Sequence, residues 1–485
     1  MFNTEDITVL FAGAGCGKTS YMVERVKKEL NVFLPEQIAF VSFTKKGASE
    51  GREKVIRKLH VDEDRLQYFK TFHALTFSAM GYKYVNIFSN ARMRQFNKLL
   101  GFNLSGNSED GNNTEDDKLL TRYDKIRNGV SNFIDDAGYD EDRYERFVHA
   151  YESYKSVNNL IDFQDCLINF VKRGTPLPVK VAFLDEAQDF TILQWHVAET
   201  AFADCEKIYV AGDDYQSIYT YAGARPDVLI ALANKHKVVK LEVSYRIPRK
   251  VYALAKGITD FIGEKMDKDY VPYKDMDGKV ETVTDRDYLV SLIGNSTDSW
   301  LVLFRNNYTI PAFAKRLQQE CIPYHDANGF VVGEALLARI RKYLNFQKVG
   351  YRSAAALEEF KLQYNIKDIK DDFTESMLID ADQAQMAFNY VEKFGIEELS
   401  KLAKEKPRVT VATIHKVKGA EAFNVAVFMD CSRRVARNKF DNLDSELRLL
   451  YVAFTRSQEN LYLIQSESSY GYDEIVSNIR EFNGI

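Results

Sequence analysis

Paired cysteines, long apolar runs and a secretory leader are all missing from this 485-residue sequence. Its five cysteines are scattered, and none stands in a C-x-x-C pair or at another spacing typical of metal ligands. This distribution argues against a zinc or iron–sulfur site and fits a reducing compartment. No stretch approaches the roughly 20 apolar residues of a membrane span, and the first residues lack the basic-then-apolar layout of a signal peptide. We therefore expect a cytoplasmic protein with no structural metal and no membrane association.

An excess of positive charge is missing as well. The 65 lysines and arginines are outnumbered by 70 aspartates and glutamates, so the formal net charge is −5 at pH 7. Proteins whose whole surface attracts nucleic acid are usually basic. If this chain binds nucleic acid, it must therefore use a local groove rather than its overall field.

What the sequence does contain is an alternation of helical patterns with short apolar runs, which is typical of α/β proteins. The strand-like runs are 38–43, 179–184, 207–211, 238–241, 300–304, 409–413, 425–429 and 460–464. Two mostly helical stretches, 76–165 and 334–406, interrupt the alternation. Within the first stretch, the polar and acidic segment 105–117 is expected to be a disordered loop, with an acidic tail for a partner protein as the alternative.

The segment FAGAGCGKTS, residues 11–20, joins a predicted strand at 7–11 to a predicted helix at 19–30. Glycines at every second position let backbone N–H groups turn toward anionic oxygens at the helix N-terminus. Lys18 would reach the β- and γ-phosphates, and the Thr19 hydroxyl would hold Mg²⁺. A plain glycine-rich turn is the alternative, but the shared register of strand, glycines, Lys and Thr favours a nucleoside triphosphate loop. Its binding residues would be Ala12, Gly13, Ala14, Gly15, Cys16, Gly17, Lys18, Thr19 and Ser20.

Two adjacent carboxylates follow a second predicted strand, in VAFLDEAQDF at 181–190. The end of a strand is where α/β sheets present groups to a ligand. Asp185 can hold Mg²⁺ while Glu186 polarises the attacking water, a division of roles that suits phosphoryl transfer to water. Alone, such a pair is more often a solvated acidic turn, but together with the loop at 12–19 it predicts a catalytic site.

Ten segments, taken in order, resemble the motifs of the UvrD/Rep-type helicases of superfamily 1A. They are AGAGCGKT (12–19), VSFTKKGASEGREKV (41–55), TFHALTF (71–77), DFQDCL (162–167), LDEAQDF (184–190), AGDDYQSIYTYAGA (211–224), LEVSYRIP (241–248), VLFRNN (302–307), VTVATIHKVKGAEAFNVAVF (409–428) and ELRLLYVAFTRSQENLYLI (446–464). That family characteristically has alanine at the first position of its phosphate loop. Ala12, where the general pattern has glycine, therefore matches the family variant.

The resemblance implies roles around the nucleotide. Gln188 and Gln216 would sense the γ-phosphate, and Arg246 and Arg456 would neutralise charge on the transferred phosphoryl group. The predicted catalytic residues are then Lys18, Glu186, Gln216, Arg246 and Arg456. The alternative for the two arginines is a surface ion pair.

Two further positions would touch the rest of the nucleotide if the resemblance holds. Tyr245 would stack on the adenine, and Glu421 would contact the ribose or the region around Arg456. A half-buried core aromatic is the alternative for Tyr245.

The resemblance also implies contacts to single-stranded DNA, which such proteins bind largely without regard to sequence. The matching positions are Phe43, Thr44, Lys45, His73, Tyr219, Tyr221, His415 and Lys418. Three positions depart from the family: Tyr221 replaces a tryptophan, Ala222 an arginine and Lys45 an asparagine. For His415, a core histidine remains the alternative.

The fold implied is α/β, with two RecA-like lobes that have parallel sheets and are each interrupted by a mostly helical insertion. The predicted domains are lobe 1A at 1–75 and 161–245, insertion 1B at 76–160, lobe 2A at 246–333 and 407–485, and a 2B insertion at 334–406. The 2B insertion is much shorter than the family's usual one.

The function implied is an ATP- and Mg²⁺-dependent DNA helicase or translocase that moves 3′→5′ on single-stranded DNA and on tailed duplexes. The alternative is a motor, or a DNA-gated ATPase with little unwinding of its own, that works with a protein partner in repair, recombination or defence. A compact motor of this kind would suit a bacterial cell or a phage gene acting in the host cytoplasm.

Nucleotide choice gives the first test. The family generally reads adenine with a glutamine a dozen residues or more before the phosphate loop, and the eleven residues before Ala12 contain none. We therefore expect GTP to support a sizeable share of the hydrolysis seen with ATP. Values of kcat/KM for both nucleotides check this, and a preference for ATP of about a hundredfold or more would show that another group reads the adenine edge.

Overall fold

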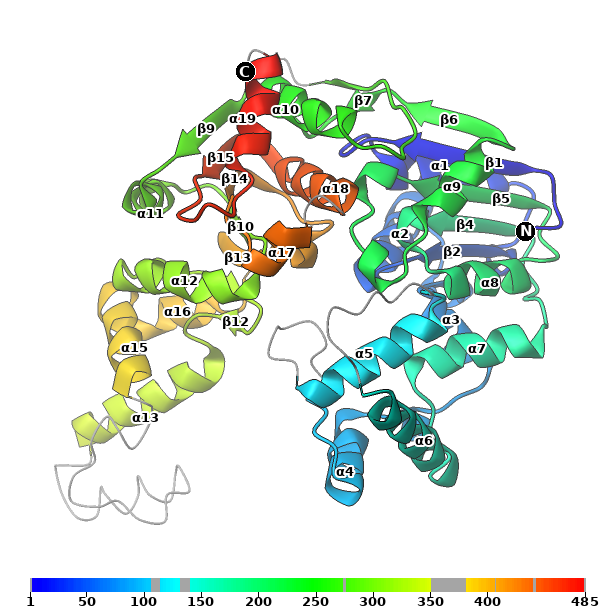
Figure 1. The fold of residues 1–485 in the computed structure, drawn as a ribbon, viewed down its shortest axis with the longest axis horizontal. Helices are drawn as coiled ribbons and strands as arrows, with labels where there is room; N and C mark the ends of the chain where they lie inside the picture. The colour runs from blue at the N-terminus through cyan, green and yellow to red at the C-terminus, as the bar shows by residue number, and fades with distance from the viewer. Residues whose placement is uncertain are drawn as a thin grey trace. The chain divides into compact units, whose positions relative to one another are not determined.

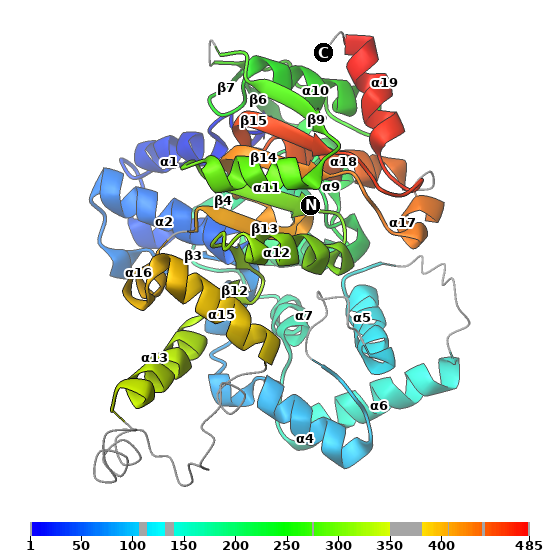
Figure 2. The same ribbon diagram turned by 90° about the vertical axis from the view of Figure 1, so that its left-hand side faces the viewer.

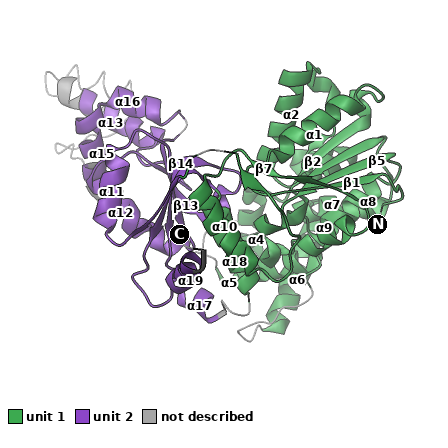
Figure 3. Ribbon diagram, turned by 90° about the horizontal axis from the view of Figure 1, so that it is seen from above, with its two compact units in different colours: residues 1–277, 438–455, 482–485 green, residues 278–437, 456–481 purple. Residues whose placement is uncertain are grey.

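The computed structural model describes residues 2–105, 114–130, 140–273, 276–349, 381–405, 407–438 and 442–483. The chain forms two compact units (Figure 3). The first contains residues 1–277, 438–455 and 482–485, and the second contains residues 278–437 and 456–481. The domain boundaries inferred from the sequence stay a prediction. No helix among the residues described is both long and apolar enough to cross a membrane.

The first unit is built on a six-stranded sheet in which every strand pair is parallel. Its strands are β1 (Ile7–Ala12), β2 (Ile38–Ser42), β3 (Phe69–Lys70), β4 (Val181–Asp185), β5 (Lys207–Gly212) and β6 (Lys237–Leu241). The order across the sheet is β3-β2-β4-β5-β1-β6. Because all six strands run in one direction, the segments that follow β1, β2, β4 and β5 start from the same edge.

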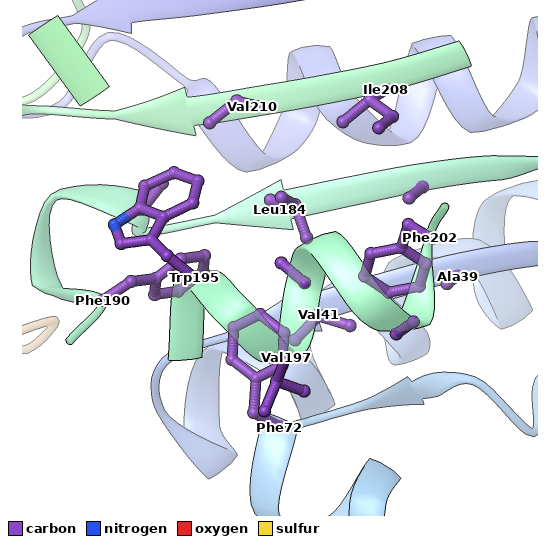
Figure 4. Close-up of a cluster of buried hydrophobic side chains, with 14 of the residues drawn as sticks. Ala39, Val41, Phe72, Leu184, Phe190, Trp195, Val197, Phe202, Ile208 and Val210 are labelled. Carbon is purple, nitrogen blue, oxygen red and sulfur yellow. The ribbon is translucent and has the colours of Figure 1, made fainter. Parts of the chain in front are cut away.

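Both faces of this sheet are buried. Along β2, Ala39 and Val41 join one apolar core, while Ile38 and Phe40 join the other. The continuous apolar run in the sequence therefore reflects a strand covered on both sides. In the first core, Trp195 of α8 (Ile192–Ala201) packs against Phe190 and the β4–β5 side of the sheet (Figure 4).

Helices surround the first sheet and form a separate helical part between β3 and β4. Those around the sheet include α1 (Lys18–Glu29), α2 (Lys45–Leu59), α8 and α9 (Pro226–Ala233), whereas α10 (Arg249–Asp260) and α18 (Leu443–Phe454) pack against each other in the same unit. Those between β3 and β4 are α3 (Phe72–Ala79), α4 (Asn90–Leu100), α5 (Glu115–Arg127), α6 (Glu141–Val157) and α7 (Phe163–Arg173). Helices α4, α5 and α6 lie near one another (Figures 1 and 2). They share an aromatic-rich core of their own.

The expectation of a loop over 105–117 is wrong at its C-terminal end. Residues 106–113 lie outside the described residues, but Glu115–Asp117 form the first turn of α5. The Thr114 hydroxyl accepts a hydrogen bond from the Asp117 N–H at 3.1 Å, and the Asp117 carboxylate accepts one from the Thr114 N–H at 2.9 Å. In this capping box, the acidic residues stabilise the N-terminus of α5.

The second unit contains a seven-stranded sheet in the order β12-β11-β13-β10-β14-β15-β9. Its strands are β9 (Lys279–Val283), β10 (Trp300–Phe304), β11 (His325–Asp326), β12 (Gly329–Phe330), β13 (Val409–Thr413), β14 (Ala422–Phe428) and β15 (Ser457–Ile464). All pairs are parallel except β11 with β12. Its helices include α11 (Arg286–Asn295), α12 (Ile310–Gln319), α13 (Glu334–Val349), α15 (Ala381–Phe394), α16 (Ile396–Leu402), α17 (Arg433–Asn438) and α19 (Asp473–Asn483).

The predicted fold class is confirmed: two α/β lobes with parallel sheets, each carrying helices between two of its strands. All eight strand-like runs found in the sequence coincide with strands. Strand β9 was not predicted, because it is an edge strand whose sequence KVETV alternates polar and apolar residues and so lacks a continuous apolar run. In the predicted 2B insertion, the described residues form α13, α15 and α16, and residues 350–380 lie outside them.

Candidate functional site

The phosphate loop leaves the carboxyl end of β1 and enters α1. Gly15 and Gly17 have φ angles of 76° and 78°, a left-handed region that only glycine adopts at no steric cost. Gly17 is the N-cap of α1, so the unpaired N–H groups of the first helical turn lie at the loop. Lys18 begins α1 and is buried, with its Nζ 3.5 Å from the Ala12 carbonyl oxygen. This arrangement suits the oxygens of a phosphate chain.

Three side chains from distant segments hold the loop in place. The Ser244 hydroxyl donates to the Ala14 carbonyl at 2.7 Å, and the Ala14 N–H donates to the Tyr451 hydroxyl at 3.2 Å. The Tyr451 oxygen lies 2.8 Å from that of Tyr270. A Cβ added to Gly13 would fall 2.2 Å from the Tyr270 ring, so this position has room for glycine only.

Sequence reasoning missed Ser244, Tyr270 and Tyr451 as supports of the loop. Ser244 and Tyr451 lie inside segments that resemble helicase motifs, at 241–248 and 446–464, so those segments offered a signal. Tyr270 belongs to no such segment and offered none. Beside Tyr270, burial raises the pKa of Cys16 to about 12, so this thiol stays protonated.

The predicted carboxylate pair stands at the end of β4. Asp185 is buried, and Glu186 follows it with φ of 55°, an uncommon left-handed conformation for a residue other than glycine. The Glu186 N–H donates to the Asp185 carboxylate at 3.0 Å. Burial, together with the negative charge of Glu186, raises the pKa of Asp185 to about 7, although the positive charge of Lys18 opposes the rise.

Asp185 and Thr19 fit the requirements of Mg²⁺. Their carboxylate and hydroxyl oxygens are the hard ligands that Mg²⁺ prefers, and a cation would favour the charged form of the buried Asp185. Within the described ranges, no group of three or more His, Cys, Asp or Glu side chains could hold a metal by itself. A Mg²⁺ ion here would therefore need nucleotide phosphates and water as its other ligands.

A chain of hydrogen bonds links Glu186 to the segment after β5. The Gln188 amide donates to the Glu186 carboxylate at 2.5 Å, and its oxygen accepts from the Asp213 N–H at 3.0 Å. The Gln216 amide donates to the side-chain carboxylate of the same Asp213 at 2.6 Å. The two predicted γ-phosphate sensors are thus both attached to Asp213.

Lys268 neutralises the carboxylates of this segment and was missed by sequence reasoning. Its Nζ lies 3.0 Å from the Asp213 carboxylate and also pairs with Asp214, and all three side chains are buried. Burial pushes the pKa of Asp213 upward, but the positive charges of Lys268 and Lys18 hold it below its ordinary value. Asp213 therefore stays ionised and can accept the bond from Gln216.

Tyr245 is exposed rather than half-buried, so the core alternative for this residue is wrong. Its side chain is 61% exposed, and its N–H donates to the Gly15 carbonyl at 3.0 Å, which places it beside the phosphate loop. A second ring, Tyr273, lies 5.1 Å away between ring centroids and is 70% exposed. The two rings follow the paired strands β7 (Val243–Ser244) and β8 (Val271–Pro272), a pairing that the sequence pattern did not reveal.

The two predicted arginines lie in different units. In the first unit, an Arg246 Nη1 is 3.5 Å from the Thr455 carbonyl oxygen. In the second unit, Arg456 is buried and donates to the Ala420 carbonyl at 3.3 Å, so it is not a surface residue.

Glu421 also belongs to the second unit, where it directly precedes β14 and lies close in space to the start of β15. Its carboxylate accepts a hydrogen bond from the Gln458 amide at 2.9 Å. Since Gln458 lies two residues after Arg456, this bond brings Glu421 near the Arg456 segment, and a contact of Glu421 with the nucleotide stays a prediction.

Three aromatic residues predicted to contact single-stranded DNA form a row. Phe43 follows β2, while Tyr219 and Tyr221 come from the segment after β5. The ring centroids of Phe43 and Tyr219 are 5.3 Å apart, and those of Tyr219 and Tyr221 are 6.4 Å apart. Tyr221 is 55% exposed at the outer end.

The other predicted DNA contacts lie near the ends of strands. Thr44 caps α2 by accepting the Gly47 N–H at 3.0 Å, and Lys45, the first residue of that helix, is exposed. Burial lowers the pKa of His73 to about 4, so its imidazole is neutral near pH 7. The Phe163 ring meets His73 edge-on at 6.0 Å and is 61% exposed; sequence reasoning missed it, although it lies in the motif-like segment 162–167. In the second unit, His415 and Lys418 follow β13 and are half-buried.

Comparisons with known proteins identify a family for this chain. The model of the UvrD/REP helicase N-terminal domain matches residues 2–237, and that of the UvrD-like helicase C-terminal domain matches residues 408–464. The ATP-dependent DNA helicase Rep of Escherichia coli (strain K12) is 26% identical over 360 residues, which cover 66% of this chain and 53% of that protein. A probable DNA helicase of Mycoplasma pneumoniae is 24% identical over 503 residues, covering 94% of this chain and 80% of that protein.

The two family models together span more than half of the chain, and they carry the phosphate loop, the carboxylate pair and Arg456. The chain therefore belongs to the UvrD/Rep-type helicases of superfamily 1. It spans about half the length of the Rep relative that it matches.

The carboxylate pair gives a second test. We expect Glu186→Gln to keep nucleotide binding but to lose turnover by about 10²–10⁴-fold, because a neutral amide cannot accept the proton of the attacking water. The control is Glu206→Gln, the same change just before β5, at the opposite edge of the sheet. Steady-state hydrolysis and binding of a fluorescent nucleotide measure the two properties. Turnover of Glu186→Gln within about twofold of the unaltered chain would remove Glu186 from the reaction.

Proposed function

We propose that this protein is an ATP-dependent DNA helicase or translocase that moves 3′→5′ along single-stranded DNA. The observation that carries the proposal is that one sheet edge bears both the phosphate loop with its carboxylate pair and the row Phe43–Tyr219–Tyr221. Phosphate chemistry and a stacking surface for bases are thereby built on the same strand ends. The names of the Rep and Mycoplasma relatives support DNA as the substrate.

In the proposed reaction, Lys18 and the N–H groups at the start of α1 bind the β- and γ-phosphates. Glu186 orients the attacking water and accepts its proton, while the hydrogen bond from Gln188 fixes the direction of the carboxylate. Thr19 and Asp185 would hold Mg²⁺, which would supply positive charge at the phosphate oxygens. Arg246 and Arg456 add charge to the transferred group.

The segment from Asp213 to Tyr221 provides a physical link between hydrolysis and the strand. The Gln216 amide donates a hydrogen bond to the Asp213 carboxylate, and Tyr219 and Tyr221 follow Gln216 within five residues. A shift of Gln216 when the γ-phosphate leaves would therefore be transmitted to the aromatic row through a short stretch of backbone. Such a change of grip with each nucleotide cycle is what directed motion requires.

A second candidate function is a motor, or DNA-gated ATPase, that depends on a protein partner and unwinds little DNA alone. The observation that favours it is the short insertion between β12 and β13, which spans residues 331–408 including the part outside the described residues. In either case the bacterial sources of the relatives support a site of action in a bacterial cytoplasm.

The aromatic row provides a third test. A stacked base contributes roughly 1–3 kcal/mol, so Tyr221→Ala should weaken binding of an oligothymidylate by about five- to a hundredfold. Hydrolysis at saturating DNA should fall much less, because the residues proposed to bind and hydrolyse the nucleotide are unchanged. Tyr288→Ala, which removes an exposed tyrosine from α11, is the control. Fluorescence anisotropy measures the affinities, and an unchanged affinity of Tyr221→Ala would exclude its ring from the strand.

Strand displacement tests direction and separates the two candidate functions. We expect the protein to displace a strand from a duplex with a 3′ tail, and to leave otherwise identical 5′-tailed and blunt duplexes intact. Displacement chiefly of the 5′-tailed duplex would overturn the polarity. DNA-stimulated hydrolysis with no displacement of any duplex would favour the partner-dependent motor or the ATPase.

A further inference from the structure

Helix α17 carries a concentrated positive charge and lies outside the ten motif-like segments of the sequence. Its sequence is RRVARN, and it follows β14 in the second unit. Strands β13 and β14 both run parallel to β10, so the segments after all three leave the same edge of the sheet. The Ser432 N–H, just before α17, donates to the side-chain oxygen of Asn306, just after β10, at 2.9 Å. This bond fastens the start of the helix to that edge.

Three arginines share one side of α17. Residues 433, 434 and 437 fall within about 100° of one another around a helix, because each residue turns it by about 100°. All three are exposed, whereas Val435 and Ala436, on the other side, are partly buried. Among the described residues, none of the three arginines is in an ion pair.

The acidic residue that most closely precedes α17 is already engaged. One oxygen of Asp430 pairs with Arg286 at 3.1 Å, and the other accepts the Glu467 N–H at 3.0 Å. Like charges three or four residues apart destabilise a helix. A bound anion would remove that repulsion, so the arrangement favours an external negative partner over a purely structural role.

An exposed aromatic ring lies beside the same segment. Tyr308, in the turn after β10, is 64% exposed. Tyr308 comes two residues after Asn306, whose side-chain oxygen accepts the hydrogen bond from the Ser432 N–H at the start of α17. The turn that carries the Tyr308 ring is therefore attached to the base of that helix. Cations interleaved with an aromatic ring are the composition of a single-strand binding surface.

We propose that the exposed face of α17, formed by Arg433, Arg434 and Arg437, binds phosphate groups of single-stranded DNA, with Tyr308 as an adjoining surface for a base. The guanidinium group holds phosphate oxygens with two parallel hydrogen bonds and stays charged at any working pH. The inference rests on the proposed function and extends the DNA contacts beyond His415 and Lys418, which follow β13 at the same edge. A local cluster of this kind lets a chain of net charge −5 bind a polyanion.

The test removes the three charges and measures how binding depends on salt. Removing one phosphate-binding cation lowers the slope of log affinity against log salt by about 0.7 for a single strand, so the triple variant Arg433→Ala, Arg434→Ala, Arg437→Ala should show a slope smaller by about 2. Its affinity for oligothymidylate at low salt should fall by roughly tenfold or more. The charge-conserving variant with lysine at the three positions should keep most of the slope. Lys401→Ala, Lys404→Ala, which removes two exposed cations around α16, should leave it unchanged.

The outcomes separate this inference from the proposed function. An unchanged slope and affinity in the triple alanine variant, with normal binding by the unaltered chain, would overturn the role of α17 alone. A loss confined to blunt duplex, or an equal loss in the lysine variant, would also overturn it, because the first points to a duplex contact and the second to a change of fold. Failure of the unaltered chain to bind any DNA would overturn the proposed function and this inference with it.

Discussion

The parallel direction of the strands in the first sheet is the constraint on which the rest of the site depends. Because β1, β2, β4 and β5 all run the same way, the segments after them leave one edge. Those four segments carry Lys18, Phe43, Glu186 and Gln216. If one of these strands ran in the opposite direction, its functional residues would lie at the far end of the sheet. The core buried on both faces holds the strands in register and so sets the relative positions of these side chains.

Around Asp213, the site contains buried carboxylates that require a positively charged partner. A buried carboxylate costs several kcal/mol unless a partner compensates for the lost water. Lys268 provides the compensation for Asp213 and Asp214, and the ring of Tyr215 lies under its ammonium group at 3.2 Å. The ionised Asp213 then positions both Gln188 and Gln216. We infer that this network is why the two glutamines are held in a single arrangement.

The phosphate loop illustrates a division between local and distant causes. Its glycines and Lys18 are local features, and their conformations follow from the short segment itself. The groups that keep the loop in place are distant in sequence: Ser244, Tyr270 and Tyr451 converge on it through the fold. The left-handed conformation of Glu186 is by contrast accompanied by local contacts, because its N–H donates to the neighbouring Asp185 and its carboxylate accepts from Gln188 two residues later.

The sequence by itself determined the features that depend on local patterns. Buried strands such as β4 and β10 appear as continuous apolar runs, and the loop at 12–19 and the pair Asp185–Glu186 are recognisable from residue types at short spacing. It misassigned the acidic start of α5, because the capping role of Thr114 and Asp117 depends on one turn of helix that composition does not reveal. Only the tertiary structure decided that Tyr245 is exposed beside Tyr273, that Lys268 pairs with Asp213, and that the start of α17 is bonded to the segment after β10. Each of these contacts joins residues that are distant in sequence. Such contacts depend on how the strands pair and the cores pack, and short-range sequence patterns do not encode them.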